Sequence, residues 1–211
     1  DYASTSGEAA DGILKLILKQ KEALAPAAPA QTAPKSGAKA APDLFADGLA
    51  PMVQDYLDVV QTFNGGKSLK VYPGSPFITQ HLLRPHDKLK LFELHPTDHK
   101  ILASYLGDVP GVEIKLADGF ATLKGHLPPP TRRGVLLIDP SYELKTDYVR
   151  TLAALREALE RFAECVVIIW LPQLQLVEAA QLPQRLKAAA DSGAKKGWLH
   201  ARLTVAHAAS L

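Results

Sequence analysis

The sequence predicts an α/β fold built on a mostly parallel sheet, with helices on both faces and an antiparallel strand at one edge. Two short runs, 134–138 and 166–171, contain no polar side chain and alternate with segments of helical spacing. Strands that are buried on both faces of a parallel sheet have this continuous apolar pattern. Residues 199–205 instead alternate apolar with polar side chains, which is typical of a half-exposed edge strand.

Composition narrows the class of protein. The 211 residues are 47% hydrophobic and 22% charged, which excludes a wholly disordered chain and allows a sizeable core. The single cysteine, Cys165, excludes an intramolecular disulfide framework and Cys-rich zinc modules. No apolar run approaches the roughly 18 residues of a membrane span. Because the net charge is only +2, any contact with nucleic acid must be a local patch.

The first third of the chain is expected to be helical. Apolar residues at helical spacing predict helices over 13–24 and 49–63, and Asn64-Gly65-Gly66 is a stop signal for the second. Between them, residues 25–42 consist mainly of Ala and Pro, which offer little surface to bury and few backbone donors. We therefore expect residues 1–64 to form a helical segment with a flexible insertion at about 25–42.

Strands and helices are expected to alternate from Ser75 onward. Ser75-Pro76 is a helix-start signal, and the apolar residues of 148–162 recur at steps of 4, 3, 4 and 3. The expected elements are a helix from Ser75, a strand over 89–93, a helix over 97–106, a strand over 112–117, a short helix over 120–127, a strand over 134–139, a helix over 148–162, a strand over 166–171, a helix over 183–190 and the strand over 199–205.

Three successive strands end in an acidic residue: Glu93, Asp118 and Asp139. In open parallel sheets the ligand lies beyond the carboxyl ends of the strands. An acid in this place can accept hydrogen bonds from the ribose hydroxyls of an adenosine-containing cofactor. An Asp-Gly pair such as Asp118-Gly119 can accept from the adenine amino group and leave space for the ring. The alternative for Asp118 is that it only caps the short helix that follows.

The third strand end, Asp139-Pro140-Ser141-Tyr142, resembles the Asp/Asn-Pro-Pro-Tyr/Phe signature of methyltransferases that modify exocyclic amino groups of bases. An aromatic amine is a weak nucleophile because its lone pair is delocalised into the ring. Asp139 and the carbonyl of Pro140 could accept its two N–H hydrogens and favour a pyramidal nitrogen. Tyr142 could stack on the base once the base has left its helix or loop.

From about Gly7 to about Val205 the chain resembles the ribosomal RNA large-subunit methyltransferase J family. The resemblance is found in four blocks, Tyr72 to Pro76, Glu93 to Asp98, Ala117 to Phe120 and Arg132 to Tyr148. It implies a single Rossmann-like class I methyltransferase domain over residues 1–211. It also implies transfer of a methyl group from S-adenosylmethionine to N6 of one adenine in large-subunit ribosomal RNA.

The resemblance also implies a role for individual residues. Those that match the cofactor site are Ser75, Glu93, Asp118, Gly119 and Asp139. Those that match the catalytic motif are Asp139, the catalytic residue, and Pro140 and Tyr142, which shape the base pocket. Trp170-Leu171-Pro172 corresponds to the end of the next strand and is expected to wall that pocket.

The chain departs from the family pattern in two respects. Ser141 stands where the family has a second proline, so we expect a looser turn. The family's Gly-rich cofactor loop precedes Asp1, and its last strands follow Leu211. We therefore expect the sequence to be truncated at both ends and to lack the first strand of its own sheet, since a central strand cannot be dropped without exposing its neighbours.

Two other function classes stay open at this point: a non-catalytic RNA- or ribosome-binding protein that kept the fold, and a DNA adenine-N6 methyltransferase. We expect ribosomal RNA as the partner, a monomer, no membrane association and a cytoplasmic location, with an organelle as the alternative. We expect no metal, because His95 and His99 lack a third ligand. Residues 65–68 resemble a phosphate loop, but Gln61 occupies the position of its first glycine.

Overall fold

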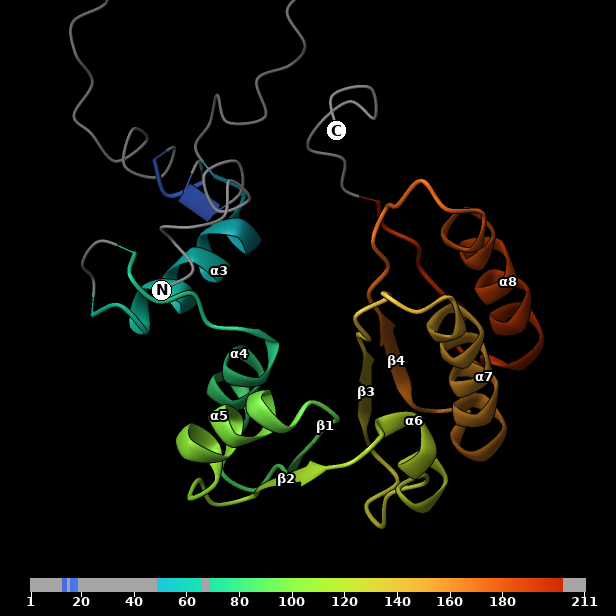
Figure 1. Cartoon of the computed structure of the whole chain (residues 1–211), viewed down its shortest axis with the longest axis horizontal. Coiled ribbons are helices and arrows are strands. Elements are labelled where there is room, and N and C mark those ends of the chain that lie inside the picture. Colours follow the sequence, from blue (N-terminus) through green and yellow to red (C-terminus); the bar gives the residue numbers. More distant parts are fainter. Residues whose placement is uncertain (1–12, 15, 19–48, 66–68, 203–211) are drawn as a thin grey trace, which may run out of the picture. The chain divides into compact units, whose positions relative to one another are not determined.

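The computed structural model describes residues 13–14, 16–18, 49–65 and 69–202 (Figure 1). The chain divides into two compact units: residues 1–89 with 110–112, and residues 90–109 with 113–211. The predicted Ala/Pro insertion at 25–42 lies outside the described residues, as do residues 66–68 of the segment that resembles a phosphate loop. The expectation of a single domain over 1–211 stays a prediction.

The first unit is helical in its described part. Residues 13–14 and 16–18 are helical, and α3 spans Pro51–Thr62 with Leu57 buried. Asn64 ends this helix as predicted. Its amide nitrogen donates to the carbonyls of Val60 and Val71, at 3.0 and 2.8 Å, and its amide oxygen accepts from the backbone N–H of Val71 at 2.9 Å. One side chain therefore holds the end of α3 against the chain that leads to the next helix.

Helix α4 begins at Ser75, where the sequence predicted a helix start, and spans Ser75–Leu82. Pro76 occupies its first turn, where the missing N–H of proline costs no intrahelical bond. The ring of His81 lies 5.7 Å from that of Phe63, just after α3. This contact joins the end of α3 to α4.

The first pair of strands contains β1 (Leu89–Glu93) and β2 (Val112–Leu116), linked by α5 (Pro96–Leu106). All but the first residue of each strand belong to the second unit. At one end the N–H of Leu89 donates to the carbonyl of Gly111 at 2.9 Å, and at the other the N–H of Ala117 donates to the carbonyl of Glu93 at 3.1 Å. The strands therefore run parallel, as predicted.

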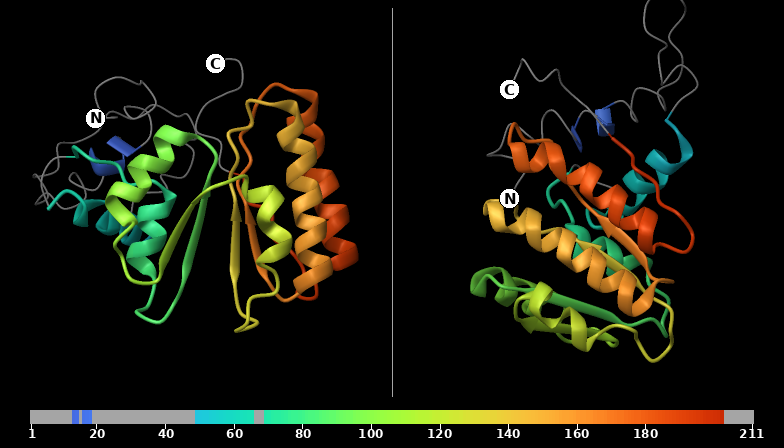
Figure 2. Two further views of the ribbon diagram at one scale, coloured as in Figure 1. Left: turned by 60° about the horizontal axis from the view of Figure 1, so that its bottom comes forward. Right: turned by 90° about the vertical axis from the view of Figure 1, so that its right-hand side faces the viewer.

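A second parallel pair contains β3 (Val135–Ile138) and β4 (Val166–Ile169). Between β2 and β3 lie α6 (Gly119–Thr122) and the 3₁₀ helix η1 (Leu123–Gly125). Helix α7 (Lys145–Phe162) links β3 to β4, and α8 (Val177–Gly193) follows β4. Figures 1 and 2 show α7 and α8 side by side, next to this strand pair.

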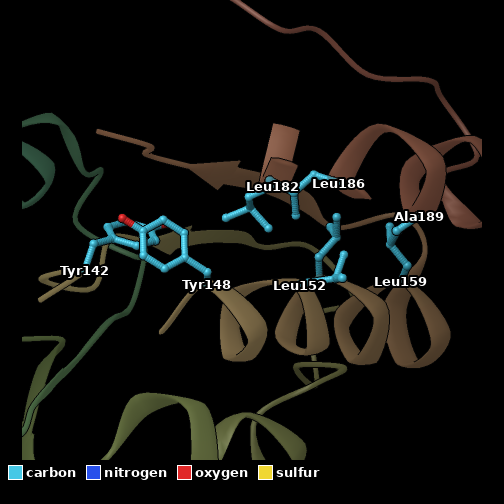
Figure 3. Close-up of a cluster of buried hydrophobic side chains, with 8 residues drawn as sticks. Tyr142, Tyr148, Leu152, Leu159, Leu182, Leu186 and Ala189 are labelled. Atoms are coloured by element: carbon cyan, nitrogen blue, oxygen red, sulfur yellow. The ribbon is translucent and has the colours of Figure 1, made fainter. Parts of the chain in front are cut away.

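The main core of the second unit lies between α7, α8 and one face of the β3–β4 pair (Figure 3). Leu152 of α7 and Leu182 of α8 are each only 2% exposed. From the sheet, Val167 and Ile169 pack against this cluster. The step pattern of 4, 3, 4 and 3 in α7 therefore identified the helix face that is buried.

The other face of the β3–β4 pair is open, so the prediction of burial on both faces is wrong for these strands in the described chain. Val135, Leu137, Val166 and Ile168 are 68%, 43%, 57% and 50% exposed. Successive side chains of a strand point to opposite faces, and within this unit α7 and α8 cover only one of them. A continuous apolar run therefore predicts a strand, but it does not show whether both faces of that strand are covered.

Three further differences from the predicted fold concern sheet organisation and element ends. The described strands form two separate pairs, β1–β2 and β3–β4, and not one continuous sheet. Residues 199–202 form no strand, and the rest of the predicted edge strand lies outside the described residues. Helix α8 begins six residues before Pro183, which lies inside it.

Within the described ranges, no helix is both long and apolar enough to cross a membrane.

Candidate functional site

The three predicted acids occupy the carboxyl ends of their strands. Glu93 is the last residue of β1, Asp118 follows β2 by two residues, and Asp139 directly follows β3. Because β1 and β2 run parallel as neighbours, Glu93 and Asp118 lie at the same edge of that pair. Asp139 lies at the corresponding edge of the β3–β4 pair.

Glu93 is half-buried and has one carboxylate oxygen engaged. Its Oε1 accepts a hydrogen bond from the backbone N–H of His95 at 2.7 Å, which holds the side chain against the start of α5. Its Oε2 has no hydrogen-bond partner among the described residues. A fixed carboxylate with one free oxygen can accept a hydrogen bond from a hydroxyl group.

Asp118 caps α6 and also forms an ion pair. Its Oδ1 accepts from the backbone N–H groups of Phe120 and Ala121, at 3.0 and 3.4 Å, and its Oδ2 accepts from the guanidinium of Arg150 on α7. Partial burial acts to raise the pKa of Asp118, but these hydrogen bonds outweigh it and hold the pKa below its ordinary value. The capping role considered from the sequence is confirmed.

Gly119 lies against β1. A Cβ at this position would stand 3.3 Å from the Cβ of Phe92. The Asp118-Gly119 pair therefore has a packing reason for its glycine, in addition to the space that the sequence analysis assigned to a bound ring. The neighbouring Phe120 ring lies 4.6 Å beneath the Arg150 guanidinium, so the same arginine contacts both the cap and the helix.

Asp139 is exposed and makes no hydrogen bond or ion pair within the described part of the chain. Partial desolvation raises the pKa of its carboxyl group above the ordinary value. Pro140, which follows it, is half-buried. A carboxylate at the end of β3 that is unpaired among the described residues remains available to accept hydrogen bonds from a ligand.

Tyr142 does not present its ring to solvent. The side chain is 3% exposed, its ring lies 5.0 Å from that of Tyr148, and its hydroxyl donates to the backbone carbonyl of Trp170 at 2.8 Å. Burial raises the pKa of this hydroxyl. Its backbone has a φ of 56°, in the left-handed region that side chains rarely adopt. The stacking face that the sequence predicted at Tyr142 is therefore covered.

Trp170 directly follows β4 and lies beside Asp139. Its backbone N–H donates to the carbonyl of Ile138 at 3.1 Å, and its own carbonyl accepts from Tyr142. Its side chain is 62% exposed. The turn of the Asp-Pro-Ser-Tyr motif is thus tied to the end of β4 through both backbone polar groups of one tryptophan.

Comparison with known proteins now identifies the family. The family model described as "Ribosomal RNA large subunit methyltransferase D, RlmJ" matches residues 43–208. The chain belongs to this family. Its matched region contains all of the site residues described above.

Relatives in this methyltransferase family include two curated proteins named ribosomal RNA large subunit methyltransferase J. The one from Escherichia coli (strain K12) is 44% identical over 126 residues, which is 60% of this chain and 45% of the relative. The one from Haemophilus influenzae is 45% identical over 118 residues, 56% of this chain and 42% of the relative. The chain therefore spans about half the length of the curated relatives it matches.

A solved structure shares the fold of this chain. A crystal structure of a Legionella pneumophila protein has a TM-score of 0.61 and 31% sequence identity, and the match covers 69% of this chain and 55% of that one.

In the present family member, Ser75 is exposed at the start of α4 in the other unit, and its part in a cofactor site stays a prediction. Within the described residues, no group of three or more His, Cys, Asp or Glu is placed to hold a metal ion.

Arg150 is a contact of Asp118 that the sequence did not predict. It lies 32 residues from Asp118, in the helical repeat of α7, and reads as an ordinary solvent-facing residue. Only the fold brings the two together, so no local signal could have found it. Trp170 was recognised as a strand end, and its bonds to the motif turn are new from the structure.

Proposed function

We propose that this chain is part of an S-adenosylmethionine-dependent methyltransferase that acts on N6 of an adenine in large-subunit ribosomal RNA. The observation that supports this most directly is Asp139, an exposed and unpaired carboxylate at the start of the Asp-Pro-Ser-Tyr turn. Family membership and the names of the two curated relatives support the choice of ribosomal RNA. For the whole protein we propose a Rossmann-like class I fold in which both strand pairs belong to one sheet.

The proposed chemistry needs acceptors for the amino group more than it needs a strong base. Bound S-adenosylmethionine supplies the methyl group on a sulfonium. The carboxylate of Asp139 and the carbonyl of Pro140 each accept one N–H of the adenine amino group, which localises its lone pair on nitrogen. Holding the amine in this geometry favours direct in-line attack. As the carbon–nitrogen bond forms, the bond from the methyl carbon to sulfur would break and leave a neutral thioether. The methylated nitrogen would then lose one proton to solvent.

The residues at the β1–β2 edge fit an adenosine-containing cofactor. Among the described residues, the Oε2 of Glu93 has no partner and could accept from a ribose hydroxyl. The carboxylate of Asp118 accepts three hydrogen bonds, two on Oδ1 and one on Oδ2. A carboxylate has about four acceptor sites, so one remains on Oδ2 for an amino group. Capping by Asp118 and a role in the cofactor site are therefore compatible.

The decisive experiment is Asp139→Ala in the full-length protein, because this change removes the carboxylate that would accept an N–H of the adenine amino group. We expect methyl transfer to a large-subunit ribosomal RNA transcript to be lost, with the thermal unfolding midpoint unchanged. The matched control is Glu160→Gln, an exposed position on α7, which should transfer at the wild-type rate. Wild-type transfer by the Asp139→Ala variant would contradict the mechanism.

Two other functions can be distinguished by further measurements on the full-length protein. A non-catalytic RNA-binding protein would show no heat of binding with S-adenosylmethionine in calorimetry on the full-length protein. A DNA methyltransferase would modify DNA of the same sequence as the RNA transcript, and would do so in preference to it. We also propose that the protein is a monomer, which light scattering on the full-length protein would check.

A further inference from the structure

We propose that Arg150 is a positioning residue for the cofactor: it orients the carboxylate of Asp118 so that the remaining acceptor site on this carboxylate selects the amino group of adenine. The proposal rests on the proposed function, because it concerns how the S-adenosylmethionine site recognises its base. Arg150 lies outside the four blocks that carry the family resemblance, yet it contacts the acid that follows β2.

The carboxylate of Asp118 is held by two different elements. Its Oδ1 accepts from the backbone N–H groups of Phe120 and Ala121 in α6, at 3.0 and 3.4 Å. Its Oδ2 accepts from the guanidinium of Arg150 on α7. A carboxylate that is held through one oxygen can still turn about its bond to Cβ, whereas one held through both oxygens is fixed. Arg150 therefore sets the direction of the one acceptor site that remains.

The Arg150 side chain is itself held by packing. Its guanidinium carbon lies 4.6 Å from the centroid of the Phe120 ring, which is within cation–π distance. That ring packs in turn against the buried cluster that contains Ala154. Ala154 lies one turn after Arg150 on α7, so one face of this helix carries both the arginine and a core contact. The guanidinium thus rests on a packed ring, which suits it to position another group.

The charge state of Asp118 determines what it can bind. Partial burial acts to raise the pKa of Asp118, but the hydrogen bonds from Arg150 and α6 outweigh it and hold the pKa below its ordinary value. The carboxylate is therefore ionised near neutral pH and can only accept hydrogen bonds. Adenine offers it a donor, the amino group. Hypoxanthine, the base of inosine, has a carbonyl oxygen in that place, and two facing acceptors weaken binding.

The orientation of the carboxylate matters because hypoxanthine also carries a donor. Its N1 bears a hydrogen beside the carbonyl, whereas N1 of adenine is an acceptor. A carboxylate that is free to turn could accept from this N1–H and would then bind either base. A carboxylate fixed through both oxygens cannot turn to the new donor. Loss of Arg150 should therefore reduce the preference for adenine, even though the cap on Oδ1 of Asp118 remains.

The test compares two ligands of the full-length protein, S-adenosylhomocysteine and S-inosylhomocysteine, which differ only in the base. Calorimetry near neutral pH measures both dissociation constants. We expect wild type to prefer the adenosyl ligand by about 10-fold or more, and Arg150→Met to lose most of this preference. Methionine can still pack on Phe120 but donates no hydrogen bond. Arg150→Lys should restore most of the preference, because one guanidinium nitrogen makes the contact with Asp118.

Two further variants separate this role from helix packing. The matched control is Lys124→Ala, which removes the 3.9 Å ion pair between Lys124 of η1 and Glu157 of α7 without touching Asp118. Its preference between the ligands should equal that of wild type. In Asp118→Asn the amide can donate as well as accept, so the inosyl ligand should bind at least as tightly as the adenosyl ligand. Adding Arg150→Met to Asp118→Asn should change this ratio no further.

The proposal is overturned if Arg150→Met keeps the wild-type preference or weakens both ligands equally. It is also overturned if Lys124→Ala loses the preference, or if Arg150→Met shows no cooperative thermal unfolding, because either result would indicate a general structural effect. A wild type that binds both ligands equally contradicts this proposal alone. If wild type binds neither ligand and no S-adenosylmethionine, the proposed function fails, and this inference fails with it.

Discussion

Arg150 of α7 donates a hydrogen bond to the carboxylate of Asp118, the residue that follows β2 and caps α6. The same guanidinium lies over the Phe120 ring. One arginine on the helix that links β3 to β4 therefore fixes the acid at the end of β2. Side chains of the pair are 38% and 29% exposed, so solvent weakens their attraction without removing it.

Substitution at Asp118 should separate the cap from the ion pair. Asp118→Asn keeps a good helix cap and loses the charge, so we expect a loss of less than about 1 kcal/mol in the free energy of unfolding. Asp118→Ala removes both, and should cost about 1 kcal/mol more. Urea unfolding at pH 7 measures both values. Equal losses for the two variants would show that the cap contributes nothing.

The pH dependence of stability should report the same carboxylate. The pKa of Asp118 in the folded chain lies below its ordinary value of about 3.9. Its contribution to stability is therefore fully present above that ordinary value, and is lost as the pH falls through the folded-state pKa. The stability difference between wild type and Asp118→Asn should be constant from pH 6 to 8 and shrink in acid below about pH 4. A difference that grows in acid would contradict this assignment.

Two neighbouring tyrosines should respond in opposite ways to loss of the hydroxyl. The Tyr148 hydroxyl is buried and has no hydrogen-bond partner among the described residues, so Tyr148→Phe removes an unsatisfied group and should leave stability unchanged or increased. The Tyr142 hydroxyl donates to the Trp170 carbonyl, so Tyr142→Phe should cost about 1 kcal/mol. Thermal unfolding of the two variants under identical conditions makes the comparison. Equal destabilisation would mean that Tyr148 also has a partner.

Local patterns in the sequence predicted the elements and the positions of the acids well. The apolar runs placed β3 and β4, and the 4, 3, 4, 3 spacing placed the buried face of α7. Strand ends then located Glu93 and Asp139 correctly. These predictions succeed because each depends on residues close together in the chain.

The features that the sequence did not predict depend on distant residues or on a choice between two burial states. Asp118 and Arg150 are 32 residues apart, so their ion pair has no local signature. The Asp-Pro-Ser-Tyr sequence does not indicate whether the Tyr142 ring is buried or exposed. Its hydroxyl bonds to the carbonyl of Trp170, which is 28 residues away in the chain. The sequence predicted that a helix begins near Pro183, because proline is unfavourable inside a helix. In the structure α8 begins at Val177, and Pro183 lies inside it.

Gly119, which follows Asp118, lies close to Phe92 of β1. In Gly119→Ala the new Cβ would stand 3.3 Å from the Cβ of Phe92, an atom held by the backbone of β1 that cannot move far. We expect overpacking to lower the free energy of unfolding by about 1 kcal/mol, measured by urea unfolding. Gly125→Ala is the matched control, because nothing lies within 4 Å of its added Cβ, and it should be neutral or slightly stabilising. If both variants were equally stable, the contact with Phe92 would not explain the glycine, and space for a bound adenine ring would remain as its reason.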